Sequence, residues 1–218
     1  MSSSILGGQL FSRQHHEDAL DNASTLSPHL DRLFKIHAGD MPLILKKAFD
    51  DIITDAEAVL KSEIEATRDD HSLMTAIRLY RGQINHLVAV SDFLDLADID
   101  QHMAWLTRAA EFALATLTGH LAGEDADQWF ILALGKMGAG ELNYSSDIDL
   151  IIITLIDHDD YDKAQKLIRL TRRLVSIMST PTQDGIGWRI DLRLRPDPGA
   201  TPIAVSYTHL TLPTIYSV

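Results

Sequence analysis

The feature that most constrains this chain is a glycine-rich turn between two apolar runs, with two aspartates just before the second run. The runs are Trp129 to Leu134 and Leu150 to Ile153. An apolar run bounded by glycine is typical of a buried strand. Because side chains at i and i+2 of a strand lie on the same face, Asp147 and Asp149 should converge, while their apolar neighbours point into the core.

Two carboxylates beside a glycine-rich loop suit a magnesium ion that is carried by the phosphates of a nucleotide. Mg²⁺ prefers one or two carboxylates together with phosphate oxygens. Free backbone N–H groups of such a loop can cradle the phosphates themselves. An Asp-x-Asp pair on its own is more often a turn or a solvated strand end, so the pair needs a third partner to indicate a metal site.

The segment Ile186 to Arg195 supplies a third acid, Asp191. Apolar and charged residues alternate along this segment, which predicts a further strand. Its apolar face would carry Trp188, Ile190, Leu192 and Leu194, and its charged face Arg189, Asp191, Arg193 and Arg195. A carboxylate flanked by arginines is typical of a metal ligand among phosphate-binding cations, since a planar guanidinium reaches two oxygens at once. An exposed edge strand kept soluble by charge would show the same stripe. Together, however, the turn, the Asp pair and this strand form a specific constellation.

The spacing of these motifs is similar to that of the nucleotidyltransferase superfamily that includes DNA polymerase beta, in which a third acid follows on a later strand. More narrowly, two ungapped stretches resemble the bifunctional glutamine synthetase adenylyltransferase/adenylyl-removing enzyme family: Leu134-Gly135-Lys136-Met137-Gly138-Ala139-Gly140-Glu141-Leu142-Asn143-Tyr144-Ser145-Ser146-Asp147-Ile148-Asp149-Leu150 and Arg189-Ile190-Asp191-Leu192-Arg193-Leu194-Arg195-Pro196. Ala139 stands where the family commonly has a second glycine. The resemblance extends weakly through the preceding helical part and stops near Ser206.

The resemblance implies a metal-dependent nucleotidyltransferase whose catalysis is mainly positioning and electrostatics. Three acids would hold Mg²⁺ or Mn²⁺ and act as the catalytic residues: Asp147, Asp149 and Asp191. Five further residues would bind the phosphates of the nucleotide: Gly135, Lys136, Ser146, Arg193 and Arg195. ATP, ADP, AMP and inorganic phosphate would be substrates or products. These oxygen-only ligands favour a hard cation over zinc.

Members of the family carry two such units in tandem, and this chain resembles the first of them. The long lead before the motif and the segment Pro181-Thr182-Gln183-Asp184-Gly185 both favour that assignment. In the family, the first unit removes AMP from a tyrosine of glutamine synthetase by phosphorolysis and gives ADP. The second unit attaches AMP from ATP and would be absent here. The resemblance therefore implies glutamine synthetase as the protein substrate, a role in nitrogen metabolism, and a PII-type signalling protein as a regulator.

The expected fold class is α+β, with an N-terminal helical region followed by a nucleotidyltransferase-type mixed β-sheet flanked by helices. Residues 1–26 are poorly patterned. Apolar residues at helical spacing predict amphipathic helices over 27–123. A polar break after them separates a catalytic domain at 127–206, which the resemblance implies is incomplete.

The last segment, 207–218, has no helical stripe and contains Pro213. It resembles the peptide produced when sequencing-adaptor DNA is read as coding sequence. We therefore expect a non-native tail on a truncated piece of a longer enzyme, with an edge strand that closes the sheet as the alternative.

Composition narrows the class of partner and the cellular compartment. The chain contains no cysteine, which excludes disulfides and thiolate zinc sites. It shows neither a signal peptide nor an apolar run long enough to span a bilayer, so we expect a cytoplasmic enzyme without a membrane partner. A formal net charge of −12 opposes non-specific binding to nucleic acid and favours a small nucleotide or a protein substrate.

Two other functions fit part of the pattern. One is a small-molecule or antibiotic adenylyltransferase of the same superfamily, which the long helical lead and the Arg-Leu-Arg-Pro strand disfavour. The other is a non-catalytic nucleotide-binding interaction module. The presence of all three carboxylates disfavours this second alternative.

Overall fold

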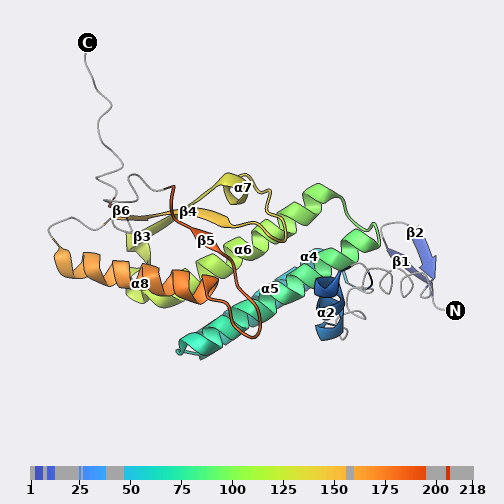
Figure 1. Cartoon of the computed structure of the whole chain (residues 1–218), viewed down its shortest axis with the longest axis horizontal. Helices are drawn as coiled ribbons and strands as arrows, with labels where there is room; N and C mark the ends of the chain where they lie inside the picture. Colours follow the sequence, from blue (N-terminus) through green and yellow to red (C-terminus); the bar gives the residue numbers. More distant parts are fainter. Residues whose placement is uncertain are drawn as a thin grey trace, which may run out of the picture.

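The computed structural model describes residues 3–6, 9–12, 25, 27–37, 47–155, 160–194 and 205–206. A set of helices comes first and a small mixed sheet follows, so the α+β prediction is confirmed (Figure 1). The elements that build the body are α2 (Pro28–Ile36), α4 (Phe49–Ala66), α5 (Asp70–Phe93), α6 (Ile99–Ala122), the 3₁₀ helix η2 (Gly123–Gln128), β3 (Trp129–Leu134), α7 (Gly135–Gly138), β4 (Ile148–Thr154), α8 (Tyr161–Ser179), β5 (Ile190–Asp191) and β6 (Val205–Ser206).

Helices α4, α5 and α6 pack against one another through the apolar stripes that the sequence predicts. Two of these helices begin at aspartate caps. The carboxylate of Asp69 accepts a hydrogen bond from the N–H of Ser72 at the start of α5. Asp98 and Gln101 form a reciprocal capping box at the start of α6. Their shared core contains fully buried side chains from all three helices: Ile53, Leu73, Ile77, Val88, Ala110 and Leu117.

The central strand of the sheet is β4. Strand β3, which has the predicted bounds, runs antiparallel to β4 and places Leu134 opposite Asp149. Strand β5 runs parallel to β4, with Ile148 opposite Ile190, and β6 pairs in parallel near the other end of β4. Because β3 already occupies one edge of β4, β5 and β6 lie along the opposite edge.

The strand predicted over 186–195 is much shorter in the structure. Strand β5 has two residues, and the chain turns at 193–194. Trp188 and Leu192 are buried, as expected for the apolar face, whereas Leu194 is 55% exposed. The prediction for Leu194 was wrong because the alternation of faces ends where the chain turns away from β4.

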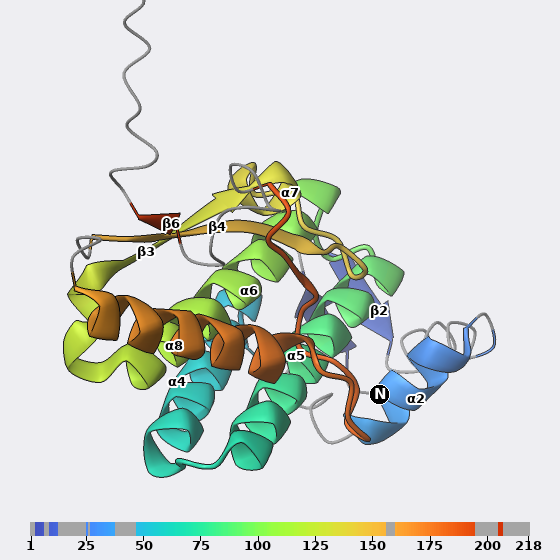
Figure 2. The same ribbon diagram turned by 60° about the vertical axis from the view of Figure 1, so that its left-hand side comes forward.

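The sheet is covered by helices on one face. Helices α6 and α8 lie against that face, and the buried side chains of Leu150 and Ile152 join them in one hydrophobic cluster (Figures 1 and 2). On the opposite face Phe130 and Leu132 of β3 remain about half exposed, so the prediction of a fully buried strand was wrong for this face of β3. The register of β3 with β4 places Asp149 on this second face, so a carboxylate lies on the face that the helices leave open.

The predicted domain boundary coincides with a change of architecture. The 3₁₀ helix η2 lies between the helices and the sheet. One hydrophobic cluster nevertheless contains residues from both sides of η2, for example Leu117 and Ile148. The division into 27–123 and 127–206 stays a prediction, and the tail at 207–218 lies outside the described residues.

Near the N-terminus, strands β1 (Ser3–Leu6) and β2 (Gln9–Ser12) pair in antiparallel fashion within the segment that the sequence left without a pattern. Over the described residues, none of the helices has the length and apolar character needed to cross a membrane.

Candidate active site

The two strands that run in parallel bring two of the predicted acids together. In the register of β4 and β5, Asp149 lies directly opposite Asp191. Paired residues of neighbouring strands have their side chains on the same face of the sheet. Asp147 precedes β4 by one residue, and Ile148 and Leu150 on either side of Asp149 are fully buried. The alternation that the sequence predicted around Asp149 is therefore confirmed.

Gly135 lies in close contact with the Asp149 carboxylate. Its φ of +54° is in the left-handed region that favours glycine. A Cβ atom at this position would collide with Oδ2 of Asp149. The backbone conformation favours glycine at position 135, and any side chain there would also force the Asp149 carboxylate to move.

The carboxylates of the other two predicted acids, Asp147 and Asp191, each form an ion pair with an arginine. Arg189 forms an ion pair with Asp147 through Nε and donates a second hydrogen bond to the carbonyl of Ser145 at 2.9 Å. The Nε of Arg193 lies 3.0 and 2.9 Å from the two carboxylate oxygens of Asp191. The backbone N–H of Arg193 donates to the same carboxylate at 2.8 Å, which closes the turn after β5.

The charges of this site are coupled through Arg193. The guanidinium of Arg193, and then its backbone N–H, hold the pKa of Asp191 below its ordinary value. The pKa of Arg193 is raised, mainly by its hydrogen bond to Asp191, and Asp147 and Asp149 add to the effect. All three predicted acids therefore act on one guanidinium group, which places their carboxylates within electrostatic range of it.

The donors at this site suit a hard divalent cation, although the site is not preformed. Within the described residues no three His, Asp or Glu side chains are grouped to hold a metal ion. Asp147 and Asp191 are instead engaged by arginines. The carboxylate of Asp149 has no hydrogen bond or ion pair to any described residue, and Asp149 lies beside Asp191. Two adjacent carboxylates, and no nitrogen ligand, match the preference of Mg²⁺ and Mn²⁺.

The loop before β4 is closed by an asparagine that sequence reasoning did not single out. Ser146 Oγ donates to the side-chain oxygen of Asn143 at 2.9 Å and accepts from the Asn143 N–H at 3.1 Å. The N–H of Ser145 donates to the same Asn143 oxygen at 3.1 Å. The Ser146 hydroxyl thus stabilises the turn, and its predicted contact with phosphate would require these bonds to open. Asparagine in such a loop is a signal for this kind of turn.

The remaining predicted phosphate ligands are spread over the rim of the site. Lys136 is exposed in the single turn of α7, where a glycine-rich turn was expected. Arg193 is largely exposed despite its contact with Asp191. Arg195 lies outside the described residues. The proposed roles of these three residues stay predictions.

Sequence reasoning missed Arg81 of α5, which connects the helices to both loops of the site. Its guanidinium donates to the carbonyls of Tyr144 at 2.8 Å and Ile186 at 3.1 Å, and also to that of Gly187. It lies over the ring of Trp188 at 5.3 Å from the ring centre. Burial, and then the nearby charge of Arg189, lower the pKa of Arg81 to about 10. Arg81 therefore links the loop before Asp147 to the segment that leads to Asp191.

A second arginine on the same helix supports this segment. Arg78 is almost fully buried and donates to the carbonyls of Gly185 at 3.2 Å and Ile177 at 3.1 Å, and to that of Thr180. The signal in the sequence was faint: two arginines three residues apart, next to the apolar stripe of the helix.

The sequence was compared with known proteins. The model of the family described as glutamate-ammonia ligase adenylyltransferase matches residues 45–211, which extends beyond the expected end of the resemblance near residue 206. A relative from Agrobacterium fabrum is 32% identical over 214 residues, which covers 87% of this chain and 22% of the relative. A relative from Rhizobium meliloti is 34% identical over 222 residues, which covers 87% of this chain and 22% of the relative. A relative from Brucella suis is 39% identical over 158 residues, which covers 62% of this chain and 16% of the relative.

Each of these three relatives is named bifunctional glutamine synthetase adenylyltransferase/adenylyl-removing enzyme. The chain spans about a fifth of the length of the first two relatives, 22% in each case.

Replacing Gly135 by alanine tests the contact with Asp149. Gly123 has nearly the same φ, +56° against +54°, but no atom lies within 4 Å of a Cβ built there. We expect Gly135→Ala and Gly123→Ala each to lower the unfolding free energy by about 1 kcal/mol or more, because an L-residue is strained at a positive φ. If Asp149 is a metal ligand, as the sequence predicts, only Gly135→Ala should weaken Mn²⁺ binding, by about 10- to 100-fold, because it displaces that carboxylate. Electron paramagnetic resonance titration of Mn²⁺ and urea unfolding measure the two effects, and equal Mn²⁺ affinities in the two variants would contradict the proposed contact.

Replacing Arg81 by lysine tests the link between the helices and the site. Lysine keeps the charge but cannot bind carbonyls of two separate loops with one planar group. We expect Arg81→Lys to lower the unfolding free energy by about 1–3 kcal/mol, because carbonyls lose their donors, and also to weaken Mn²⁺ binding. Arg172→Lys, at an exposed position of α8, is the control and should change neither quantity. A loss of stability with unchanged Mn²⁺ affinity would limit Arg81 to a structural role.

Proposed function

The chain belongs to the glutamate-ammonia ligase adenylyltransferase family, and we propose from this membership that it is a metal-dependent nucleotidyltransferase that acts on glutamine synthetase. The observation that carries the proposal is the register of β4 and β5, which places Asp149 beside Asp191 on one face of the sheet. Two adjacent carboxylates next to a glycine that a side chain would obstruct form a suitable site for a phosphate-bound cation. The names of the relatives include both adenylyltransferase and adenylyl-removing activities.

Of these two directions, we propose removal of AMP by phosphorolysis. The support comes from the sequence, because 181–185 and the long helical lead resemble the first unit of the family. In this reaction an oxygen of inorganic phosphate attacks the phosphorus of tyrosyl-AMP in line. The new P–O bond forms as the bond to the tyrosine oxygen breaks. The proton lost by phosphate ends on the tyrosine, and ADP leaves.

The acids of the site would position the reacting groups. Asp149 and Asp191 would hold the cation, with Asp147 as a further ligand after release from Arg189. A bound Mg²⁺ would supply positive charge that neutralises the phosphoryl oxygens and stabilises the entering and leaving oxygens. Most of the rate enhancement would then come from orientation and electrostatics.

The arginines would exchange partners when the substrate binds. In the structure, Arg193 neutralises Asp191 and feels the charges of Asp147 and Asp149. A cation between these acids would take over that role. The Arg193 side chain, 84% exposed, would then be free to bind the transferred phosphate. The proposed phosphate contacts of Gly135 and Lys136 lie at the start of α7, at the same end of the sheet as Asp149.

The test is ADP release from adenylylated glutamine synthetase by the purified chain with phosphate and Mg²⁺. We expect Asp149→Asn to lower the rate by about a hundredfold or more, because it removes a charge that acts on the transition state. Asp162→Asn, an exposed aspartate at the start of α8, is the matched control and should keep full activity. EDTA should abolish the reaction, and Mg²⁺ or Mn²⁺ should restore it.

The contrary outcomes separate the parts of the proposal. More than about a tenth of wild-type activity in Asp149→Asn would exclude Asp149 as a metal ligand. Transfer of AMP from ATP to glutamine synthetase, without phosphorolysis, would reverse the assigned direction. Binding of nucleotide without either reaction would identify a non-catalytic module.

A further inference from the structure

A pocket of about 540 Å³ adjoins the carboxylate site and shares Ser146 and Arg189 with it. Its walls come from α2, α5, the loop at 144–146 and the connection between α8 and β5. In Figure 2 this connection, drawn in orange to red, runs alongside α2 and α5. The Arg32 guanidinium of α2 donates to the carbonyl of Gln183 at 3.2 Å, which ties these walls together.

The pocket carries an excess of positive charge. Four guanidinium groups line it, against one carboxylate, Asp184, among the described lining residues: Arg32, Arg78, Arg81 and Arg189. Arg78 and Arg81 donate to backbone carbonyls and form no ion pair among the described residues, although the charge of Asp184 acts on Arg78. One lining carboxylate does not balance these partly buried guanidinium groups, and an anion in the pocket would offset the excess positive charge.

An amide group in the wall points to the same kind of ligand. Asn85 is 8% exposed and lines the pocket. Its side chain makes no hydrogen bond to any described residue. The amide lines the pocket without a partner from the described residues, and its two N–H donors suit an oxyanion. Leu33, Ile36 and Leu79 supply an apolar wall nearby.

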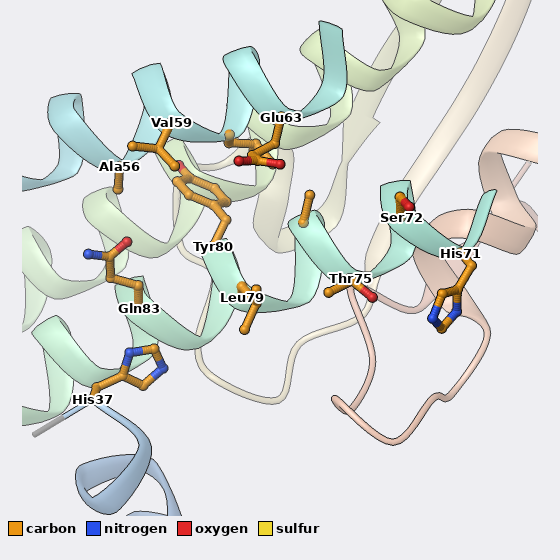
Figure 3. Close-up of a pocket in the computed structure, with 12 residues that line it drawn as sticks. His37, Ala56, Val59, Glu63, His71, Ser72, Thr75, Leu79, Tyr80 and Gln83 are labelled. Atoms are coloured by element: carbon orange, nitrogen blue, oxygen red, sulfur yellow. The ribbon is translucent and has the colours of Figure 1, made fainter. Parts of the chain in front are cut away.

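A second pocket provides an internal comparison. It lies between α4 and α5 and has a volume of about 640 Å³ (Figure 3). Neither arginine nor lysine is among its described lining residues, and it contains the carboxylate of Glu63. Its amide, Gln83, comes from the same helix as Asn85. An anion would therefore select the arginine-lined pocket and not this one.

We propose that the arginine-lined pocket binds a phosphate group, either as free phosphate or as a phosphate monoester, with Asn85 and Arg32 as direct ligands. The pocket is within the 300–1,000 Å³ range typical of small-molecule sites. Arg189 lines it and also pairs with Asp147, so a bound phosphate would compete for a cation that neutralises the active site. The proposal does not depend on the direction of AMP transfer or on a bound metal.

Calorimetric titration with inorganic phosphate, AMP and adenosine, all without divalent cation, tests this site. We expect saturable binding of phosphate or AMP and none of adenosine. Asn85→Leu and Arg32→Gln should each weaken binding by about tenfold, the effect of one charge-assisted hydrogen bond. The matched controls are Gln83→Leu, in the second pocket, and Arg172→Gln, on the exposed side of α8, which should bind as the wild type does.

Nuclear magnetic resonance of the wild-type chain gives a second measurement that needs no variant. We expect phosphate or AMP to shift the Asn85 side-chain amide and the backbone amides of Gly82 and Gly185, and not those of Lys136 and Gly140. Binding by AMP alone would identify a monoester site, whereas binding by both would identify a site for the phosphate group itself. Absence of saturable binding by either probe, or shifts confined to Lys136 and Gly140, would overturn the proposal, while the proposed AMP transfer would stand on its own assay.

Discussion

The position of the third carboxylate depends on a strand of two residues. So short a strand supplies few backbone hydrogen bonds, yet its register with β4 is what places Asp191 beside Asp149. The helical layer provides the missing constraint. Arg78 and Arg81 of α5 bind carbonyls of the connection just before β5, and Arg81 also binds the carbonyl of Tyr144. The helices therefore act as part of the site's scaffold, although they contribute none of its predicted acids.

Electrostatic balance is the second constraint on this site. Three carboxylates close to one another repel, and burial or crowding of like charges raises the free energy of the folded chain. Arg189 and Arg193 offset that repulsion by pairing with Asp147 and Asp191. In the structure, these two arginines compensate part of the charge of the acids. The same arginines are available to phosphate if a cation takes their place, which is the physical basis of the proposed function.

The helices also determine which face of the sheet can carry chemistry. Because α6 and α8 pack on one face, the alternation of β4 sends Leu150 into the core and leaves Asp149 on the open face. This division could be predicted from the sequence, because period-2 alternation follows directly from strand geometry. The length of β5 could not, because residues 186–195 keep the alternating pattern beyond the turn at 193–194. The alternation of residue types along a segment does not show at which residue its hydrogen-bonded pairing with the neighbouring strand ends.

The sequence by itself determined the α+β class, the bounds of β3, the inward and outward residues of β4 and the identity of the candidate acids, because each follows from local periodicity or a short motif. Tertiary structure alone decided which groups meet. The contact of Gly135 with Asp149, the Asn143 turn under Ser146 and the pairing of Asp149 with Asp191 depend on how separate segments approach. The role of Arg81 is the clearest case, since it binds carbonyls 63 and 105 residues away in sequence. Such contacts are set by the packing of a shared core, which no local pattern encodes.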